Sequence, residues 1–505
     1  MEQNIFTQSA DMKQEYCATI VRIGEVKPIE GSDFLGVTLV NGLEVVVRKD
    51  SVKEGDIMIF APMETALNEQ FLSINNQFEI GEYERNANAS EVKQMIDAGQ
   101  KEEAKKLVGF FGKRGRVRAL KLRGIYSKGF LISLPMMAKY CPEIRDISME
   151  DLVGTDFDTI AGEMFIKVYI PFVPKKKERK GNRYNKSLPK YDRMIEGQFS
   201  FHYDTNQLAK EIDYIKPDDV VTLSVKLHGT SVILANVLVK TPKWIHTKSA
   251  WFNNAVHKLY CAVWQYLPAA LQKYDEVYDL VYSSRTVIKN QYINLRSSPD
   301  FYESDIWGEY HDLMADFIPR DMIVYGEIVG YLTASDKMIQ KDYDYKCDMG
   351  TNKLMLYRIT TRNADGSLHE WEVSEVRDFT LRLMTEHPEL TPRLHPIDIL
   401  YHGTLHDLYP DIPVDMHWHE QVLQAMKNDK QTLGMELREP LCNAKVPREG
   451  IVLRIDHDRT QEAWKLKTDA FFAREQKLID AGEVDIEMMT GTDDGDDDGS
   501  DGDEN

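Results

Sequence analysis

The stretch that decides the fold is Val221–Ala235, VTLSVKLHGTSVILA. In its first half, polar and apolar residues alternate with a period of two, which is the pattern of a half-buried strand. A tight His-Gly-Thr turn follows, and the apolar run after it predicts a second strand. Lys226 ends the first strand on its polar face, and Gly229 leaves room for a ligand or another backbone to approach.

A lysine at such a strand end allows two interpretations. The amine of Lys226 can act as a covalent nucleophile, provided that burial or neighbouring cations favour its neutral form. Alternatively, Lys226 is a solvent-facing residue before an ordinary hairpin turn. Further segments of the chain favour the first interpretation, because they supply the charged groups that such a nucleophile needs.

Length and composition limit the classes of protein to which this chain can belong. A chain of 505 residues is too long for one core and predicts two or three domains. No apolar run approaches the roughly 18–20 residues of a membrane span, and the N-terminus has no signal-peptide core. The five cysteines lie far apart without a CxxC pair, which argues against a zinc site and a disulfide framework. We therefore expect a soluble, cytoplasmic protein with no membrane partner.

The formal net charge of −20 hides an uneven distribution. The last thirteen residues carry eight acidic groups, which leaves −12 for the remainder. Positive charge is concentrated in Lys113–Arg123, with six cations in eleven residues, and in Lys175–Arg193. Local patches of this kind, and not the net charge, decide whether a phosphate backbone is attracted.

The chain is expected to divide into five parts. These are a mobile N-terminus (1–14), a first domain (15–173), a basic linker (174–195), a second domain (196–482) and an acidic disordered tail (483–505). The linker is either a flexible tether or a strap on a phosphate backbone. The tail is either simply solvated or a nucleic-acid mimic that competes for a basic face.

The first domain is predicted to be a small β-barrel. Short alternating runs are separated by turn signals, and the Asn41-Gly42 step between two valine-rich runs predicts a two-residue hairpin. Residues 84–110 interrupt this pattern with an Ala-, Glu- and Lys-rich stretch that predicts a helical insertion.

A basic strand pair in the first domain is a candidate nucleic-acid-binding surface. Arg116, Arg118, Lys121 and Arg123 fall on it, with Tyr126 close by. A small barrel with a cationic face and an aromatic residue is a plausible nucleic-acid platform. The alternative is a solvated edge strand that charge protects from aggregation.

The second domain contains further short apolar strands, each interrupted by one or two charges, with insertions near 240–274 and 380–440. Single charges in buried strands are costly unless they are paired or functional. The charged residues at strand positions are Lys226, Arg285, Glu327, Glu449, Lys465 and Lys467. Such a mixture suits a nucleoside triphosphate, because cations neutralise phosphates while carboxylates hold a hydrated Mg²⁺ or a ribose hydroxyl.

Six motifs in order resemble those of the covalent nucleotidyltransferase superfamily. Lys226-Leu-His-Gly-Thr-Ser is similar to motif I of RNA ligases that seal nicked duplex RNA, whereas DNA ligases and capping enzymes usually have Asp-Gly after the lysine. The other five are Ser283-Ser-Arg285-Thr (motif Ia), Tyr325-Gly-Glu327 (III), Leu356-Tyr357-Arg358-Ile359 (IIIa), Glu449-Gly-Ile-Val (IV) and Trp464-Lys465-Leu-Lys467 (V). FSFHYDTNQLAK (199–210) resembles bacteriophage-type members.

The resemblance covers roughly residues 15–475 and implies an α+β fold. An N-terminal OB-fold β-barrel would precede an adenylyltransferase (ATP-grasp-like ligase) domain of antiparallel sheets with helices. This order is the reverse of that in DNA ligases and capping enzymes. The long gap between Lys226 and Arg285 departs from the family pattern and puts the choice of substrate in doubt.

The resemblance also implies roles for individual residues. Lys226 would form a lysyl-AMP, and Tyr357 would stack on adenine. Glu327 and Glu449 would serve the ribose and the water ligands of a metal. The remaining ATP- and AMP-binding residues would be His228, Gly229, Arg285, Lys465 and Lys467, the last two at the α-phosphate.

The expected activity is that of an ATP-dependent RNA ligase. It would seal 3′-hydroxyl and 5′-phosphate RNA ends or nicks through a lysyl-AMP and an adenylylated RNA, with Mg²⁺ or Mn²⁺. We expect a monomer that acts on RNA in RNA repair, in the host cytoplasm if it is phage-encoded. The alternatives are a capping-type guanylyltransferase, a DNA ligase, or a catalytically dead RNA-binding relative.

Overall fold

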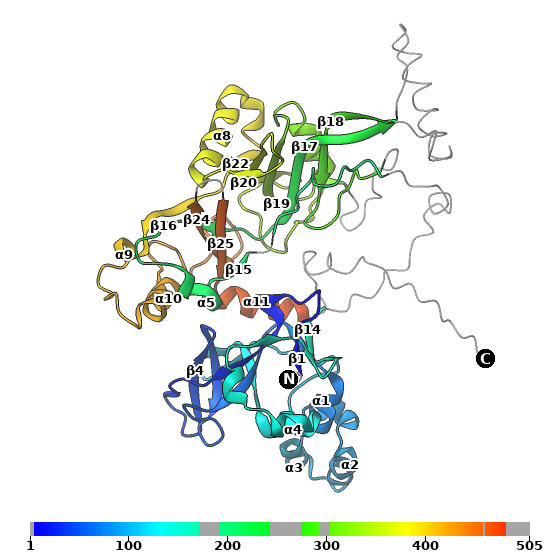
Figure 1. Cartoon of the computed structure of the whole chain (residues 1–505), viewed down its shortest axis with the longest axis vertical. Helices are drawn as coiled ribbons and strands as arrows, with labels where there is room; N and C mark the ends of the chain where they lie inside the picture. Colours follow the sequence, from blue (N-terminus) through cyan, green and yellow to red (C-terminus); the bar gives the residue numbers. More distant parts are fainter. Residues whose placement is uncertain are drawn as a thin grey trace, which may run out of the picture.

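The computed structural model describes residues 5–170, 192–203, 205–242, 274–292, 304–457 and 460–480. Residues 243–273 of the tryptophan-rich insertion, residues 174–191 of the basic linker and the whole acidic tail lie outside these ranges. Two domains follow one another along the chain, with helix α11 (Asp469–Asp480) at the boundary between them (Figure 1).

The N-terminal domain is built from short strands. They are β1 (Phe6–Thr7), β2 (Ala18–Arg22), β3 (Lys27–Pro28), β4 (Leu35–Val40), β5 (Leu43–Arg48), β6 (Ile57–Pro62), β7 (Thr65–Leu67), β8 (Leu120–Leu122), β9 (Ile125–Ser127), β10 (Gly129–Ser133), β11 (Asp156–Phe157), β12 (Thr159–Ile160), β13 (Glu163–Met164) and β14 (Ile166–Val168). The 3₁₀ segments are η1 (Gln14–Tyr16), η2 (Ile80–Arg85), η3 (Lys105–Leu107), η4 (Pro142–Asp146) and η5 (Met149–Leu152). The α-helices are α1 (Glu69–Ile74), α2 (Ala89–Asp97), α3 (Lys101–Ala104) and α4 (Leu134–Tyr140).

The strands of this domain pair in small sheets around an aromatic cluster and a separate valine-rich cluster. The largest sheets have the orders β10-β6-β2-β11 and β3-β4-β5, and among the described residues the pairings do not close into one barrel. The strands are two to six residues long and are separated by turns and helices. Phe71, Phe78, Phe111, Phe157 and Phe165 fill the core.

Two local expectations for this domain have different outcomes. The Asn41-Gly42 hairpin is confirmed: Val40 pairs with Leu43, and the turn residues have φ of 48° and 70°. The expected mobility of residues 1–14 is wrong for Phe6, which is buried and pairs with Ile160, because burying its ring outweighs the cost of ordering the chain.

The second domain contains two sheets. Its strands are β15 (Asn206–Gln207), β16 (Val220–Lys226), β17 (Thr230–Pro242), β18 (Tyr274–Ser283), β19 (Met322–Gly330), β20 (Asn352–Arg362), β21 (Leu368–Glu370), β22 (Leu394–Pro396), β23 (Ile399–Thr404), β24 (Gly450–His457) and β25 (Thr460–Lys467). One sheet has the order β15-β25-β24-β16-β23 and the other β18-β17-β19-β20-β21, with β22 beside β20. Pairing is antiparallel except for β15 with β25 and β20 with β22.

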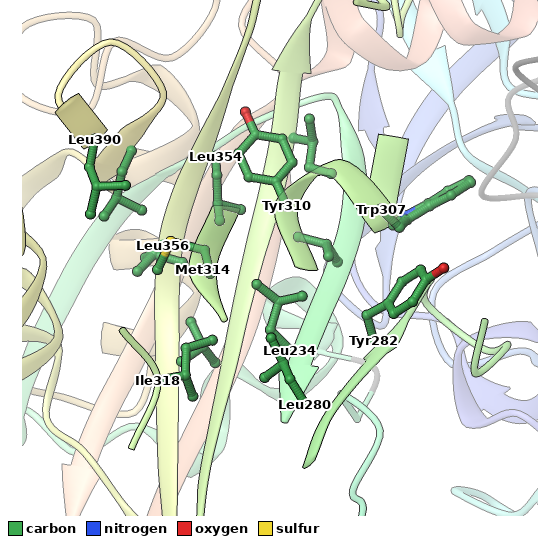
Figure 2. Close-up of a cluster of buried hydrophobic side chains, with 14 of the residues drawn as sticks. Leu234, Leu280, Tyr282, Trp307, Tyr310, Met314, Ile318, Leu354, Leu356 and Leu390 are labelled. Atoms are coloured by element: carbon green, nitrogen blue, oxygen red, sulfur yellow. The ribbon is translucent and has the colours of Figure 1, made fainter. Parts of the chain in front are cut away.

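Helices cover the outer faces of both sheets. The helical segments are α5 (Leu208–Glu211), η6 (Ile212–Tyr214), α7 (Ile306–Met314), α8 (Val373–Glu386), η8 (Pro388–Leu390), α9 (Leu405–Leu408) and α10 (Trp418–Asn428). Figure 2 shows Trp307, Tyr310 and Met314 of α7 packed against Leu234, Leu354 and Leu356 of the β17–β20 sheet. Residues from α5, α9 and α10 pack in the same way on the β16–β25 sheet.

The expected insertion at 380–440 is an integral part of this domain. It contains β23, which pairs along β16, and α10, whose Trp418, Val422 and Met426 are buried. The alternative of an ordinary hairpin turn after Lys226 is wrong, because β16 and β17 lie in different sheets. The His-Gly-Thr segment therefore carries the chain from one sheet to the other. Within the described ranges, no helix is both long and apolar enough to span a membrane.

Candidate active site

Strand register brings three lysines to one face of the β16–β25 sheet. Lys226 lies opposite Gly450 of β24, which lies opposite Lys467 of β25. Lys465, two residues before Lys467, therefore points to the same side. A Cβ on Gly450 would lie 2.1 Å from the Leu466 carbonyl oxygen, so the backbone of β25 passes too close for a side chain at this position.

Glu449 joins two of these lysines. Its Oε1 lies 2.8 Å from Lys226 Nζ and 3.3 Å from Lys467 Nζ, and its Oε2 lies 4.0 Å from His228 Nδ1. Burial disfavours its charge, but Lys226 and Lys467 outweigh burial and lower the pKa of the Glu449 carboxyl to about 2. Burial also opposes the charge of Lys467, whose pKa is nevertheless raised by Glu475 and Glu449. The site is thus a buried, charge-paired cluster at the end of β16.

The segment after Lys226 is held by hydrogen bonds from the other sheet. The His228 N–H donates to the Tyr345 hydroxyl at 2.8 Å, and the Gly229 N–H donates to Glu327 Oε1 at 2.9 Å. Gln340 Nε2 donates to the Gly229 carbonyl at 2.8 Å. A Cβ on Gly229 would lie 2.4 Å from the Ile328 carbonyl oxygen, so a side chain does not fit there. Glu327 therefore ties the His228–Gly229 segment to β19.

The side chains next to this loop form a buried cluster of apolar and aromatic residues. Val225 and Leu227 pack with Met355 of β20, and half-buried Tyr357 packs against the same cluster. Tyr357 also lies edge-on to His202, with ring centroids 5.4 Å apart. Arg285 is half-buried in the loop that follows β18. The structure thus brings Lys226, His228, Gly229, Glu327, Glu449 and Lys467 together by direct contacts, and places Tyr357 at the wall of the same cluster.

The third lysine has a partner from the other domain. Lys465 Nζ lies 2.9 Å from Glu15 Oε1 and 3.0 Å from Oε2, and both side chains are almost fully buried. Glu15 is not among the predicted site residues, since no pattern in the polar N-terminal segment marks it. Glu475 is not predicted either; it lies 3.6 Å from Lys467 and follows the last motif, on α11.

The four predicted RNA-binding residues have different environments. Arg116 is buried and donates to both carboxylate oxygens of Glu64 at 3.0–3.1 Å, so its inclusion in an exposed RNA-binding face is wrong. Arg118 is half-buried and donates to the Phe110 carbonyl at 3.0 Å. Lys121 and Arg123 are exposed on the β8–β9 hairpin, where Lys121 Nζ lies 4.9 Å from the Tyr126 ring centroid.

A cavity of about 210 Å³ lies between the two domains. The β8–β9 hairpin lines it with Gly124–Tyr126, and the second domain contributes Lys427 and Lys467–Thr468 among others. The cavity therefore connects the exposed hairpin with the lysine cluster.

The acidic side chains of the candidate site fit a cation that is held through water molecules better than a cation that they would coordinate directly. Oε2 of Glu449 is buried and has no hydrogen-bond partner, which suits a water ligand of a metal as donor. Within the described part of the chain, no group of three or more His, Cys, Asp or Glu side chains is placed to hold a metal directly.

Comparisons with known proteins agree with this architecture. A family model described as an OB-fold domain matches residues 17–95. A mutant RNA ligase of Naegleria gruberi solved with AMP and Mn is 17% identical, over 92% of this chain and 99% of that one, with a TM-score of 0.50. A mutant of that ligase with ATP and Mn has the same identity and coverage and a TM-score of 0.51. No curated protein compared with the chain matches it. The chain therefore has an N-terminal OB-fold domain, and its fold as a whole is similar to that of these RNA ligases.

Proposed function

We propose that the protein is an ATP-dependent RNA ligase that joins a 3′-hydroxyl to a 5′-phosphate through a lysyl-AMP. The observation that carries the proposal is the charge-paired cluster of Lys226, Glu449 and Lys467, at a strand end whose neighbours Val225 and Leu227 belong to the hydrophobic cluster against which Tyr357 packs. A buried amine next to cations and a pocket for a base is what covalent nucleotidyl transfer requires.

In the first step, Lys226 Nζ attacks the α-phosphorus of ATP. The bond to the bridging oxygen of the β-phosphate breaks, and pyrophosphate leaves with the electron pair. Lys226 must lose a proton first, since an ammonium has no lone pair to donate. Lys467 and Lys465 would stabilise the charge that develops on the α-phosphate, while Tyr357 would stack on adenine.

Glu449 and Glu327 have supporting roles in this step. Glu449 holds the Lys226 amine in place at 2.8 Å, and Glu327 fixes the following backbone through Gly229. A bound Mg²⁺ or Mn²⁺ would neutralise phosphate charge, and these two carboxylates would hold it through water. Arg285 would contact the ribose or a phosphate.

The next two steps act on RNA. An oxygen of the RNA 5′-phosphate attacks the adenylate and displaces Lys226, and the 3′-hydroxyl then attacks the activated phosphate and releases AMP. RNA would approach along the β8–β9 hairpin, because Lys121 and Arg123 are exposed there and the adjoining cavity reaches Lys467. Nicked duplex RNA is the substrate that the His-Gly-Thr sequence after Lys226 favours.

The proposal is tested by incubating the protein with α-labelled ATP or GTP and Mg²⁺, followed by denaturing electrophoresis. We expect label from ATP alone, lost in Lys226→Ala, and sealing of nicked RNA by the wild type. Label from GTP would indicate a guanylyltransferase, and sealing of nicked DNA alone a DNA ligase. Absence of label from either nucleotide in protein shown by mass to carry no AMP would leave an RNA-binding relative.

A further inference from the structure

The N-terminal domain places a buried carboxylate in the lysine cluster. Both oxygens of Glu15, in η1, lie within 3.0 Å of Lys465 Nζ. Lys210 of α5 anchors this 3₁₀ turn, since its Nζ donates to the Gln14 carbonyl at 2.9 Å and pairs with Asp156 at 3.1 Å. The Glu15–Lys465 contact is therefore part of a defined interface between the domains.

Lys465 needs such a partner because its surroundings oppose its charge. Burial lowers the pKa of Lys465, and the nearby cations Lys467 and Lys226 add to this, while Glu15 acts in the opposite direction. The other titratable group on η1 is Tyr16, whose pKa burial and Glu15 raise, so it is neutral and gives Lys465 no counter-charge. Glu449 and Glu475 already pair with Lys467. Glu15 is thus the carboxylate that the described structure pairs with Lys465.

We propose that Glu15 is a positioning residue of the nucleotide site, which holds the Lys465 ammonium in place and charged. An ammonium attracts the α-phosphate, whereas a neutral amine does not. The nucleotide site is then complete only when the N-terminal domain is docked, so the domain contributes to nucleotide chemistry as well as to RNA binding. This inference rests on the proposed function, because it assigns the phosphate contact of Lys465.

The test compares the pH dependence of the wild type with that of Glu15→Gln, which keeps the shape and removes the charge. Lysyl-AMP formation is measured from neutral to alkaline pH, and ATP binding is measured over the same range in a Lys226→Met background. We expect the alkaline loss of both to begin about one to three pH units lower in Glu15→Gln, as for removal of an adjacent opposite charge. Glu15→Asp is expected to restore part of the wild-type profile.

Gln476→Met is the matched control, since Gln476 donates to Glu64 across the same interface without touching the lysines. We expect its pH profile to follow the wild type. The inference would be overturned if wild type and Glu15→Gln had identical pH profiles. It would also be overturned if Glu15→Gln reacted faster at every pH, because Glu15 would then compete with the phosphate for Lys465.

The two readouts separate this inference from the proposed function. ATP binding without any lysyl-AMP in the wild type would refute the ligase, yet the pH shift in binding would still decide the role of Glu15. Failure of the wild type to bind ATP at any pH would overturn both proposals.

Discussion

At the scale of single residues, the central feature is one buried carboxylate shared by two lysines. Glu449 contacts Lys226 at 2.8 Å and Lys467 at 3.3 Å with only 3% of its side chain exposed. Removing one partner of a buried ion pair leaves an uncompensated charge, which costs about 3–5 kcal/mol. Glu449 is therefore expected to matter for folding as well as for chemistry.

Glu449→Gln is expected to weaken folding in a pH-dependent way. The pKa of Glu449 is lowered to about 2 in the folded state from 4.5, so its stabilisation is present above 4.5 and is lost as pH falls toward 2. Urea unfolding at a series of pH values should show this acid loss in the wild type and a smaller loss in Glu449→Gln. Equal acid sensitivity of the two proteins would contradict the charge pairing.

Gly229→Ala is expected to reduce lysyl-AMP formation by about 100-fold, because displacing a nucleophile by about 1 Å has effects of that size. Its Cβ would meet the Ile328 carbonyl oxygen at 2.4 Å and push the loop away from Glu327. Gly24→Ala is the control, since nothing lies within 4 Å of a Cβ there. Similar labelling of both variants by α-labelled ATP would show that the loop tolerates a side chain.

The residues of the candidate site are largely predictable from sequence, but their partners are not. Each motif is a local pattern, so Lys226, Glu327 and Glu449 are recognisable one at a time. Glu15 pairs with a lysine 450 positions away, and Arg116 with Glu64 52 positions away. No local signal marks such pairs, and for that reason the sequence suggests that Arg116 is exposed.

At the scale of elements, the His-Gly-Thr segment that links β16 to β17 connects the two sheets at the candidate site. The period-two pattern predicts β16 correctly and the apolar run predicts β17, but neither pattern says which sheet a strand joins. The hairpin at Asn41-Gly42 is predictable because its turn chemistry is local, since both residues adopt positive φ. The position of this hairpin against α5 is not predictable from sequence, because that contact depends on how the domains dock.

Gly42→Ala is expected to loosen the docking of the domains. A Cβ at Gly42 would lie 2.0 Å from the Ala209 carbonyl oxygen, in addition to the strain of φ +70°. Gly31→Ala is the matched control, because Gly31 has φ +73° and nothing lies within 4 Å of a Cβ there. Both changes should cost about 1 kcal/mol of backbone strain, but only Gly42→Ala should speed proteolytic cleavage between the domains. Equal cleavage rates would argue against the interface at α5.

The β8–β9 hairpin is expected to bind RNA and not ATP. The double variant Lys121→Gln with Arg123→Gln should bind nicked RNA more weakly. The slope of the logarithm of the binding constant against the logarithm of the salt concentration should fall by about one for each phosphate that the variant no longer neutralises. Labelling by ATP should be unchanged. Lys106→Gln is the control, because Lys106 is an exposed lysine on η3 that pairs with Glu103. The same salt dependence in the double variant and the wild type would remove the hairpin from the RNA path.

At the scale of the whole molecule, the N-terminal position of the OB-fold domain and the antiparallel sheets of the second domain follow from the resemblance of the sequence motifs. How the domains dock does not follow, because it rests on single contacts such as Lys427 Nζ to the Gly42 carbonyl at 2.8 Å. These contacts join residues that no sequence pattern marks. Docking encloses the cavity between the β8–β9 hairpin and Lys467. We therefore regard the two domains as one catalytic unit.

The most direct test of this account is to locate the nucleotide on the protein. Purified protein is freed of bound AMP with pyrophosphate, incubated with ATP and Mg²⁺, and digested for mass spectrometry. The account predicts one AMP, attached to the Lys226 peptide and released to a nicked RNA on its addition. An AMP on another lysine, or none at all, would contradict the assignment of Lys226 as the nucleophile.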